Sequence, residues 1–300
     1  MTTFLGIDAG GSKTLVLLAR DAEVIARASG APGAVRPGRA LQAATKIAAA
    51  ARQALTQAGL LQADVLVAGA AGVGREPERT ELREGLRNER LATRNIVTGD
   101  LDIALEAAFG DRPGIVLISG TGSVAVARAP DGTVHRRGGL GWQIGDEGSG
   151  FALGRAALVA IGRAHDGRGP ATALTESLLK GGPAPDFDSL IRWAGSADPP
   201  EIAALAPRVY AAAALGDEVA RTIIGTAADE LAQLVASLTP LFPPRKPIPL
   251  AIAGGNLDPG RGLRETALAR LGAVSRFSVR EARLEPGEGA LAMARRAATG

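Results

Sequence analysis

The chain has 300 residues, no cysteine, and a formal net charge of +3 from 34 basic and 31 acidic side chains. This length suits two domains of ordinary size, and the lack of cysteine excludes disulfides, thiolate metal sites and iron–sulfur clusters. No apolar run reaches the roughly 18 residues of a membrane helix and no signal peptide is evident, so we expect a cytoplasmic protein without a membrane partner. Scattered arginines and few aromatics argue against a nucleic-acid partner.

The first predicted elements are a strand, a glycine turn and two further strands. The strands are expected over 4–8, 14–19 and 23–28. Asp8 lies near the end of the first strand, and Gly10 and Gly11 let backbone N–H groups approach a phosphate. Because Asp8 would repel a bare anion, the motif indicates a Mg²⁺-nucleotide. Considered alone, an ordinary hairpin with a surface Asp explains it equally well.

Alternating helices and strands follow. We expect helices over 37–58, 77–91 and 101–109, and strands over 64–68 and 95–97. Asp100 lies between the last strand and the last helix, where an α/β sheet opens its ligand crevice. A carboxylate there can accept the proton of a hydroxyl that attacks a phosphate. Alternatively, Asp100 or Asp102 only caps the helix and complements its dipole.

A second copy of the pattern begins near residue 114. Strands are predicted over 115–118, 124–128 and 133–137, with Gly120 and Gly122 in the first turn. Internal duplication predicts two like domains facing each other. Two phosphate turns in one chain are much more specific for nucleotide binding than either turn alone. We place the boundary just before Ser119, which gives domains over 1–118 and 119–300.

The remaining sequence is predicted to be mainly helical. Helices are expected over 149–164, 199–215, 217–238, 261–271 and 286–298, and strands over 249–253 and 274–279. Ser149 is the expected N-cap of the first of these helices. Trp142 could face a ligand or anchor the core, and both interpretations stay open.

Four motifs occur in order along the chain: Asp8-Ala-Gly-Gly-Ser-Lys-Thr14, Ser119-Gly-Thr-Gly-Ser123, Gly145-Asp-Glu-Gly-Ser-Gly150 and Ala253-Gly-Gly255. Together they resemble the N-acetylglucosamine kinase / BadF-BadG-BcrA-BcrD ATPase family, within the superfamily of sugar kinases, heat-shock ATPases and actin. The resemblance extends from Leu5 to about Ala294. It implies an α/β fold with two like ribonuclease-H-type (actin-like ATPase) domains around a central cleft, and a closing helix over 286–298 that packs back on the N-terminal domain.

The resemblance also implies an activity. It indicates an ATP- and Mg²⁺-dependent kinase for the 6-hydroxyl of N-acetylglucosamine, with glucosamine or a broader range of hexoses as alternatives, and it suggests a homodimer. Asp100 would be the catalytic base and Asp8 the metal ligand. The nucleotide would contact Gly10, Gly11, Ser12, Lys13, Thr14, Gly120, Thr121, Gly122, Ser123, Gly254 and Gly255. The sugar would contact Asp100, Thr121, Gly139, Trp142, Asp146 and Glu147.

Two departures from the family pattern fall in the expected sugar pocket. The loop over 30–36 lacks an Asn that binds sugar hydroxyls in the family, and Leu140 stands where the family often has Trp. ATP use is therefore better supported than the acceptor, which could also be a muramyl sugar.

Two other functions are less consistent with this chain. The reductase-activating ATPase branch holds an iron–sulfur cluster on cysteines, which this sequence lacks. A non-enzymatic sugar sensor would need an added DNA-binding helix pair, for which we expect no room before Leu5 or after Met293.

Overall fold

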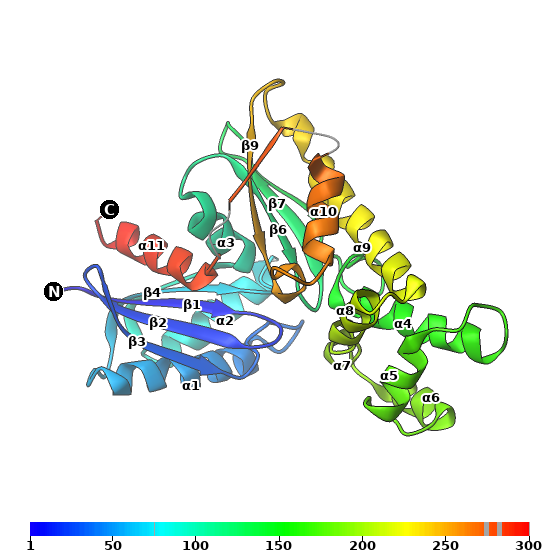
Figure 1. Cartoon of the computed structure of the whole chain (residues 1–300). Coiled ribbons are helices and arrows are strands. Elements are labelled where there is room, and N and C mark those ends of the chain that lie inside the picture. Colours follow the sequence, from blue (N-terminus) through cyan, green and yellow to red (C-terminus); the bar gives the residue numbers. More distant parts are fainter. Residues whose placement is uncertain (75, 273–275, 281–283, 300) are drawn as a thin grey trace. The chain divides into compact units, whose positions relative to one another are not determined.

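The computed structural model describes residues 1–74, 76–272, 276–280 and 284–299. The chain divides into two units (Figure 1): the first holds Met1–Arg112 and Arg283–Gly300, and the second holds Pro113–Ala282. Strand β6 (Gly114–Ser119) belongs to the second unit. The predicted boundary before Ser119 is therefore too late, because it would separate this central strand from the sheet to which it is hydrogen-bonded.

The first unit is a five-stranded sheet with helices on both faces. Its strand order is β3-β2-β1-β4-β5, in which β2 runs antiparallel to β1 and β3, while β4 and β5 run parallel to β1. The strands are β1 (Thr3–Ala9), β2 (Thr14–Arg20), β3 (Glu23–Gly30), β4 (Ala63–Ala70) and β5 (Ala92–Gly99). The helices are α1 (Ala40–Gln57), α2 (Glu76–Asn88), α3 (Asp100–Phe109) and α11 (Pro286–Thr299).

Alternation along β1 divides the core of this unit into two layers. Leu5 and Ile7 are fully buried against α1 and α2, whereas Phe4 packs on the other face with Ile103 of α3 and Leu291 of α11. Figure 1 shows α1 and α11 on opposite sides of the sheet. Successive side chains of a strand point to opposite faces, so one apolar strand supplies both layers.

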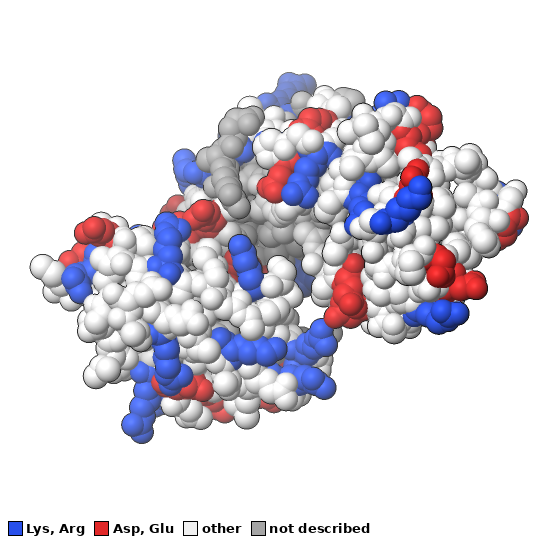
Figure 2. Space-filling view, turned by 60° about the horizontal axis from the view of Figure 1, so that its bottom comes forward, with Lys and Arg blue, Asp and Glu red and all other residues white. Residues whose placement is uncertain are grey.

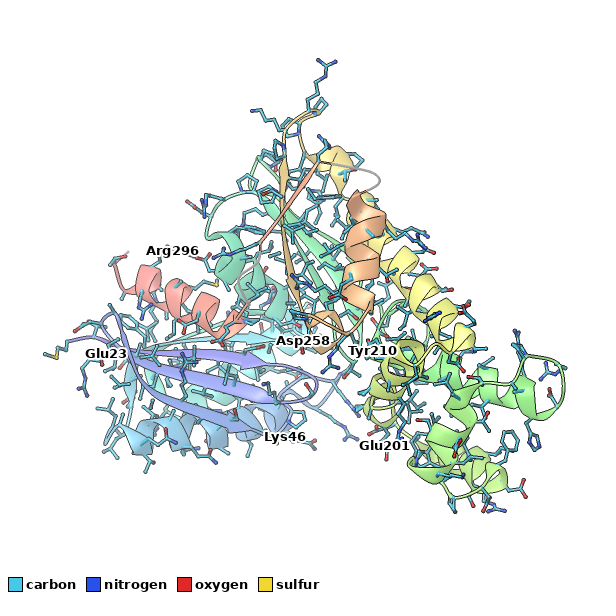
Figure 3. All side chains as sticks on the ribbon, viewed as in Figure 1. Glu23, Lys46, Glu201, Tyr210, Asp258 and Arg296 are labelled. Atoms are coloured by element: carbon cyan, nitrogen blue, oxygen red, sulfur yellow. The ribbon has the colours of Figure 1, made fainter. Side chains whose placement is uncertain are left out.

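Helix α11 approaches the sheet closely because glycines line its contact. A Cβ on Gly6 of β1 would lie 2.7 Å from the backbone N of Leu291, and one on Gly289 would lie 2.0 Å from the carbonyl oxygen of Ile103. Arg296, labelled in Figure 3, also pairs with the buried carboxylate of Glu106 on α3. The small residues of the Pro286-Gly-Glu-Gly segment thus serve helix packing.

The second unit repeats the sheet of the first. Its strand order is β10-β9-β6-β7-β8, and again three antiparallel strands are extended by two parallel ones. The strands are β6, β7 (Ser123–Arg128), β8 (Val134–Gly138), β9 (Ile248–Ala253) and β10 (Phe277–Val279). The helices and 3₁₀ turns are α4 (Gly150–His165), α5 (Ala173–Lys180), α6 (Phe187–Ser196), α7 (Pro199–Ala203), α8 (Ala206–Ala214), α9 (Glu218–Ala236), η1 (Thr239–Leu241), η2 (Gly255–Leu257) and α10 (Leu263–Gly272). The prediction of two like α/β domains is confirmed.

Some predicted boundaries are wrong in the second unit. The helix expected over 199–215 is two helices, α7 and α8, because Pro207 lacks the N–H that a continuous helix needs. Helices α5 and α6 were not predicted, although Thr172 and Asp186 are their N-caps. Of the strand expected over 274–279, β10 covers Phe277–Val279, Arg276 precedes it without strand structure, and residues 274 and 275 lie outside the described residues.

Surface charge agrees with the sequence analysis. On the face in Figure 2, basic and acidic side chains are scattered over a largely uncharged surface. Within the described ranges, every helix falls short of the length or the hydropathy that a membrane span requires.

Candidate active site

The parallel strands of the first unit bring Asp8 and Asp100 to the same edge of the sheet. Asp8 is the penultimate residue of β1, and Asp100 opens α3 directly after β5. In the register of the sheet, Ala9 lies opposite Ala70 of β4, which lies opposite Gly99 of β5. Ligands of α/β sheets bind outside the carboxyl ends of the strands, so this edge is the candidate site of the first unit.

Burial and like charge perturb Asp8. Its pKa is raised from 3.8 to about 6, first by burial and second by the negative charge of Asp100, while Lys13 acts in the opposite direction. Perturbed carboxylates at a ligand edge are typical of functional sites. A bound cation would offset both the energetic cost of burying the charged Asp8 carboxylate and its repulsion by Asp100.

The neighbouring Asp102 has a local structural role. Its Oδ2 accepts from Thr98 Oγ1 over 2.5 Å and from the backbone N of Gly99, the N-cap of α3, over 3.0 Å. Asp102 is therefore the acid that caps the helix, and it fixes the turn that carries Asp100. Asp100 makes a different local hydrogen bond, in which its Oδ1 accepts from the N–H of Leu101 over 3.0 Å.

The first glycine turn connects β1 to β2. The N–H of Gly10 donates to Lys13 O over 3.0 Å, and Gly11, Ser12 and Lys13 are exposed. Thr14 differs from the others, because it is fully buried and its hydroxyl donates to Ala31 O over 2.7 Å. Among the predicted nucleotide contacts in this turn, the Thr14 hydroxyl is therefore already used to hold the turn to the following loop.

The second glycine turn connects β6 to β7 and is anchored by two buried serines. Ser119 Oγ donates to Gly148 O over 2.8 Å, and Ser123 Oγ donates to Glu147 O over 2.5 Å. Within the turn, the N–H of Gly120 donates to Gly122 O over 2.9 Å.

The predicted sugar contacts of the second unit lie around this turn. Asp146 Oδ1 accepts from the N–H of Ser123 over 3.3 Å, and burial is the main cause of the raised pKa of this carboxyl. Glu147 is exposed, while Trp142 is 47% exposed with its ring tilted against Phe151 at 5.4 Å. Trp142 is therefore not a core anchor.

Gly139 in the same region has a left-handed backbone with φ +64°. A Cβ at this position would lie 2.5 Å from a guanidinium nitrogen of Arg136. The predicted N-cap is confirmed, since Ser149 Oγ accepts from Ala152 N over 3.1 Å.

The predicted adenosine turn lies directly against the second glycine turn. Gly254 has φ +95°, and a Cβ there would lie 2.2 Å from Ser119 O. The next residues form η2, in which Asn256 is buried and donates to Ser119 Oγ and to Gly120 O. Sequence reasoning selected the glycines and missed Asn256, whose only signal is a polar side chain directly after a buried strand and two glycines.

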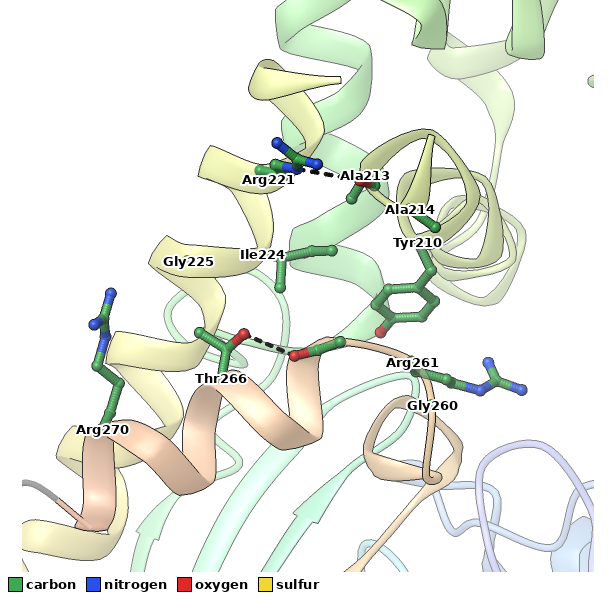
Figure 4. A pocket seen from close by; sticks show the side chains of 11 residues that line it. Tyr210, Ala213, Ala214, Arg221, Ile224, Gly225, Gly260, Arg261, Thr266 and Arg270 are labelled. Carbon is green, nitrogen blue, oxygen red and sulfur yellow. Dashed lines mark hydrogen bonds between the residues drawn. The ribbon is translucent and has the colours of Figure 1, made fainter. Parts of the chain in front are cut away.

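A pocket of about 430 Å³ is lined in part by Gly260, Arg261 and Gly262, which follow this turn in the sequence (Figure 4). Figure 4 shows Tyr210 of α8 there, beside Arg261. The guanidinium carbon of Arg261 lies 5.8 Å from the centre of the Tyr210 ring. The Tyr210 hydroxyl is buried, has no hydrogen-bond partner among the described residues, and its pKa is raised by burial. Other lining residues are Ala213, Ala214, Arg221, Ile224, Gly225, Thr266 and Arg270.

The donor set of the first unit fits Mg²⁺ rather than a metal held by protein alone. In the described part of the chain, no three His, Cys, Asp or Glu side chains gather as a metal cage. Mg²⁺ commonly binds one or two carboxylates and completes its shell with water and substrate phosphates. The buried carboxylate of Asp8, whose pKa is raised, offers one such ligand.

The duplicated sheets define an α/β protein of the actin-like ATPase fold. The model of the BadF/BadG/BcrA/BcrD ATPase family matches residues 5–266, and the chain belongs to this family. It is 30% identical over 264 residues to the N-acetylmuramic acid/N-acetylglucosamine kinase of Clostridium acetobutylicum, covering 86% of each chain. Identity to the N-acetyl-D-glucosamine kinase of Dictyostelium discoideum is 31% over 199 residues, or 63% of this chain and 62% of that protein.

A solved structure is similar over nearly the whole chain. It is the "Putative N-acetylglucosamine Kinase" from Chromobacterium violaceum, with a TM-score of 0.81 and 29% identity, and the similarity covers 98% of this chain and 99% of that one.

Proposed function

We propose that this protein transfers the γ-phosphoryl group of ATP to the 6-hydroxyl of an amino sugar, with N-acetylglucosamine favoured over glucosamine. One observation carries the proposal: Asp8 and Asp100 occupy the ends of parallel strands at one sheet edge, and the charge of Asp100 raises the pKa of Asp8. Membership of an ATPase family and similarity to amino-sugar kinases support the same proposed function.

In the proposed reaction Asp100 is the general base. Its carboxylate accepts the proton of the sugar hydroxyl while that oxygen bonds to the γ-phosphorus and the bond to the ADP oxygen breaks. General-base assistance contributes about 10²–10⁴ in rate, and positioning and charge stabilisation supply the rest. Asp102 holds the turn that aims Asp100, because it binds Thr98 and Gly99.

Asp8 is proposed to hold Mg²⁺ directly or through water. The metal, when bound, would neutralise the charge of the phosphates. Gly10 and Gly11, with the exposed Ser12 and Lys13, would then contact the phosphates from the first unit. A buried carboxylate with a raised pKa beside a second carboxylate supports this role, since a cation favours its charged form.

The second unit is proposed to bind the rest of the nucleotide. In the described part of the chain, the N–H groups of Thr121 and Gly122 are not used by hydrogen bonds within the protein, so they are available to a phosphate. Gly254 and Gly255 would receive the ribose. The nearby pocket is proposed to take the base, with Arg261 over its face and the Tyr210 hydroxyl as a polar contact.

The sugar is proposed to bind near Asp146 and Glu147, with Thr121 and Gly139 at the same site. Trp142 is proposed as the apolar surface for the sugar ring, which its exposure supports. Ring stacking on a half-exposed indole would be lost in Trp142→Ala, which should raise the KM for the sugar more than the KM for ATP.

A coupled assay of ADP release tests the proposal. Parent protein with Mg²⁺-ATP should be given N-acetylglucosamine, glucosamine, N-acetylmuramic acid, glucose and N-acetylmannosamine separately. We expect N-acetylglucosamine to give the highest kcat/KM, and NMR of the product should show phosphorus coupled to the protons on carbon 6. If no sugar raises ADP release above basal hydrolysis, the kinase proposal fails.

A variant test addresses the site itself. Asp8→Ala should abolish turnover, while a surface carboxylate such as Glu218, which is exposed in an i,i+3 pair with Arg221, can be replaced by Ala as the control. Full activity of Asp8→Ala would contradict the assignment of the metal ligand.

A further inference from the structure

One buried amide joins three segments of the second unit. Asn256 in η2 is 7% exposed. Its Nδ2 donates to Ser119 Oγ over 3.2 Å and to Gly120 O over 2.7 Å. Ser119 Oγ donates in turn to Gly148 O over 2.8 Å. The second glycine turn, the residues before α4 and η2 therefore share one hydrogen-bonded group.

The neighbours of this amide require two donors. Gly120 O is an acceptor, and Ser119 Oγ has already given its single proton to Gly148, so it can only accept from Asn256. The NH₂ group of asparagine supplies two N–H donors and fits this position. A carboxylate of the same shape would place negative oxygens against two acceptors.

Close packing of glycines prevents another arrangement of the turn. A Cβ on Gly150 would lie 3.1 Å from Gly120 O and 3.2 Å from Asn256 Nδ2. The N–H of Gly150 also donates to Gly120 O, over 2.8 Å. Two donors from different segments thus hold the Gly120 carbonyl in one direction.

Fixing this carbonyl fixes the next N–H. The peptide between Gly120 and Thr121 is planar and trans, since the described residues contain no cis peptide bond. The Thr121 N–H therefore points away from Asn256, opposite to the carbonyl. This N–H makes no hydrogen bond within the described protein, so it is available to an anion.

We infer that Asn256 is a positioning residue for nucleotide phosphate: it sets the direction of the Thr121 N–H through the Gly120 carbonyl, without touching the phosphate. The inference rests on the proposed function, because it takes the second glycine turn as a phosphate site. It assigns a residue of the adenosine turn to phosphate binding. Asn256 thereby links the adenosine turn to the second glycine turn.

The test compares nucleotide and sugar affinity in Asn256→Asp. Titration calorimetry with Mg²⁺-ADP should show a dissociation constant at least tenfold higher than in the parent protein. The dissociation constant for N-acetylglucosamine should stay within twofold, and in steady state the KM for ATP should rise more than the KM for sugar. A loss of fold stability alone would not separate the two ligands.

Asn95→Asp is the matched control. Its amide also donates to a backbone carbonyl, Ala92 O at 2.9 Å, but it lies in β5 of the first unit. We expect its Mg²⁺-ADP affinity to stay within twofold of the parent value. If Asn256→Asp does not fold, Asn256→Ala removes both bonds without adding charge and should still weaken Mg²⁺-ADP at least threefold.

The outcomes separate this inference from the function on which it rests. If the parent protein binds Mg²⁺-ADP and the folded Asn256 variants bind it equally well, the positioning role is wrong and the proposed function stands. If the parent protein does not bind Mg²⁺-ADP at all, the proposed function fails and the inference fails with it.

Discussion

The contribution of Asp8 to the stability of the ligand-free protein should fall as the pH rises from about 4 to about 6. The pKa of Asp8 is raised from 3.8 to about 6 in the folded protein. A group that holds its proton more tightly when folded stabilises the fold below its unfolded pKa, and this stabilisation is lost as pH rises through the folded pKa. A shift of about two units, at about 1.36 kcal/mol each, gives about 3 kcal/mol. Because Asp8 is partly exposed, solvent screening makes this an upper value.

Urea unfolding at several pH values, with a chelator present, measures this contribution. Circular dichroism should be the probe, because both tryptophans, Trp142 and Trp193, belong to the second unit. The free energy of unfolding of the parent minus that of Asp8→Asn should fall by up to about 3 kcal/mol between pH 4 and 6.5, and then level off. Asp100→Asn should reduce the fall by removing the like charge. A difference that stays flat or rises with pH would refute the buried, like-charged environment.

Three further predictions concern Asp100 and Asp102 in the first unit, and Gly254 and Tyr210 in the second. Asp100→Asn should lower kcat by about 10²–10⁴ with nucleotide affinity retained, whereas Asp102→Asn should mainly lower stability, by about 1–3 kcal/mol; the reverse pattern in kinetics and thermal unfolding would show that the carboxylates are misassigned. Gly254→Ala should cost more than the about 1–3 kcal/mol of its positive φ, because it also meets Ser119 O, and should weaken Mg²⁺-ADP binding. Gly132→Ala, with φ +85° and open space, is its control, and equal losses of stability in the two variants would count against the close contact. Tyr210→Phe should leave stability unchanged or higher, since its hydroxyl has no described partner, yet lower ATP affinity severalfold; unchanged ATP affinity would place the base elsewhere.

Much of the fold is readable from the sequence because its signals are local. Apolar runs ending in glycine turns mark β1 and β6 as buried strands, and the repeat of that pattern predicts two like sheets. Sequence patterns do not predict the helix boundaries where a single residue interrupts the pattern, as at Pro207. They also miss short helices that depend on caps, as in α5 and α6. Asp8 and the glycine turns could be selected for the same local reason, since their chemistry lies within a few consecutive residues.

What the sequence by itself determined, then, is which residues carry charge, which turns lack side chains and which family pattern they match. Tertiary structure decided how those residues act on one another. Asp100 raises the pKa of Asp8 only because parallel strands bring the ends of β1 and β5 to one edge. The roles of Asp102 and Asn256 depend on which acceptors and donors face them, and Asn256 meets Gly120 from 136 positions away along the chain. Such contacts join distant segments through hydrogen bonds of fixed direction, so the spacing of residues in a single sequence does not reveal them.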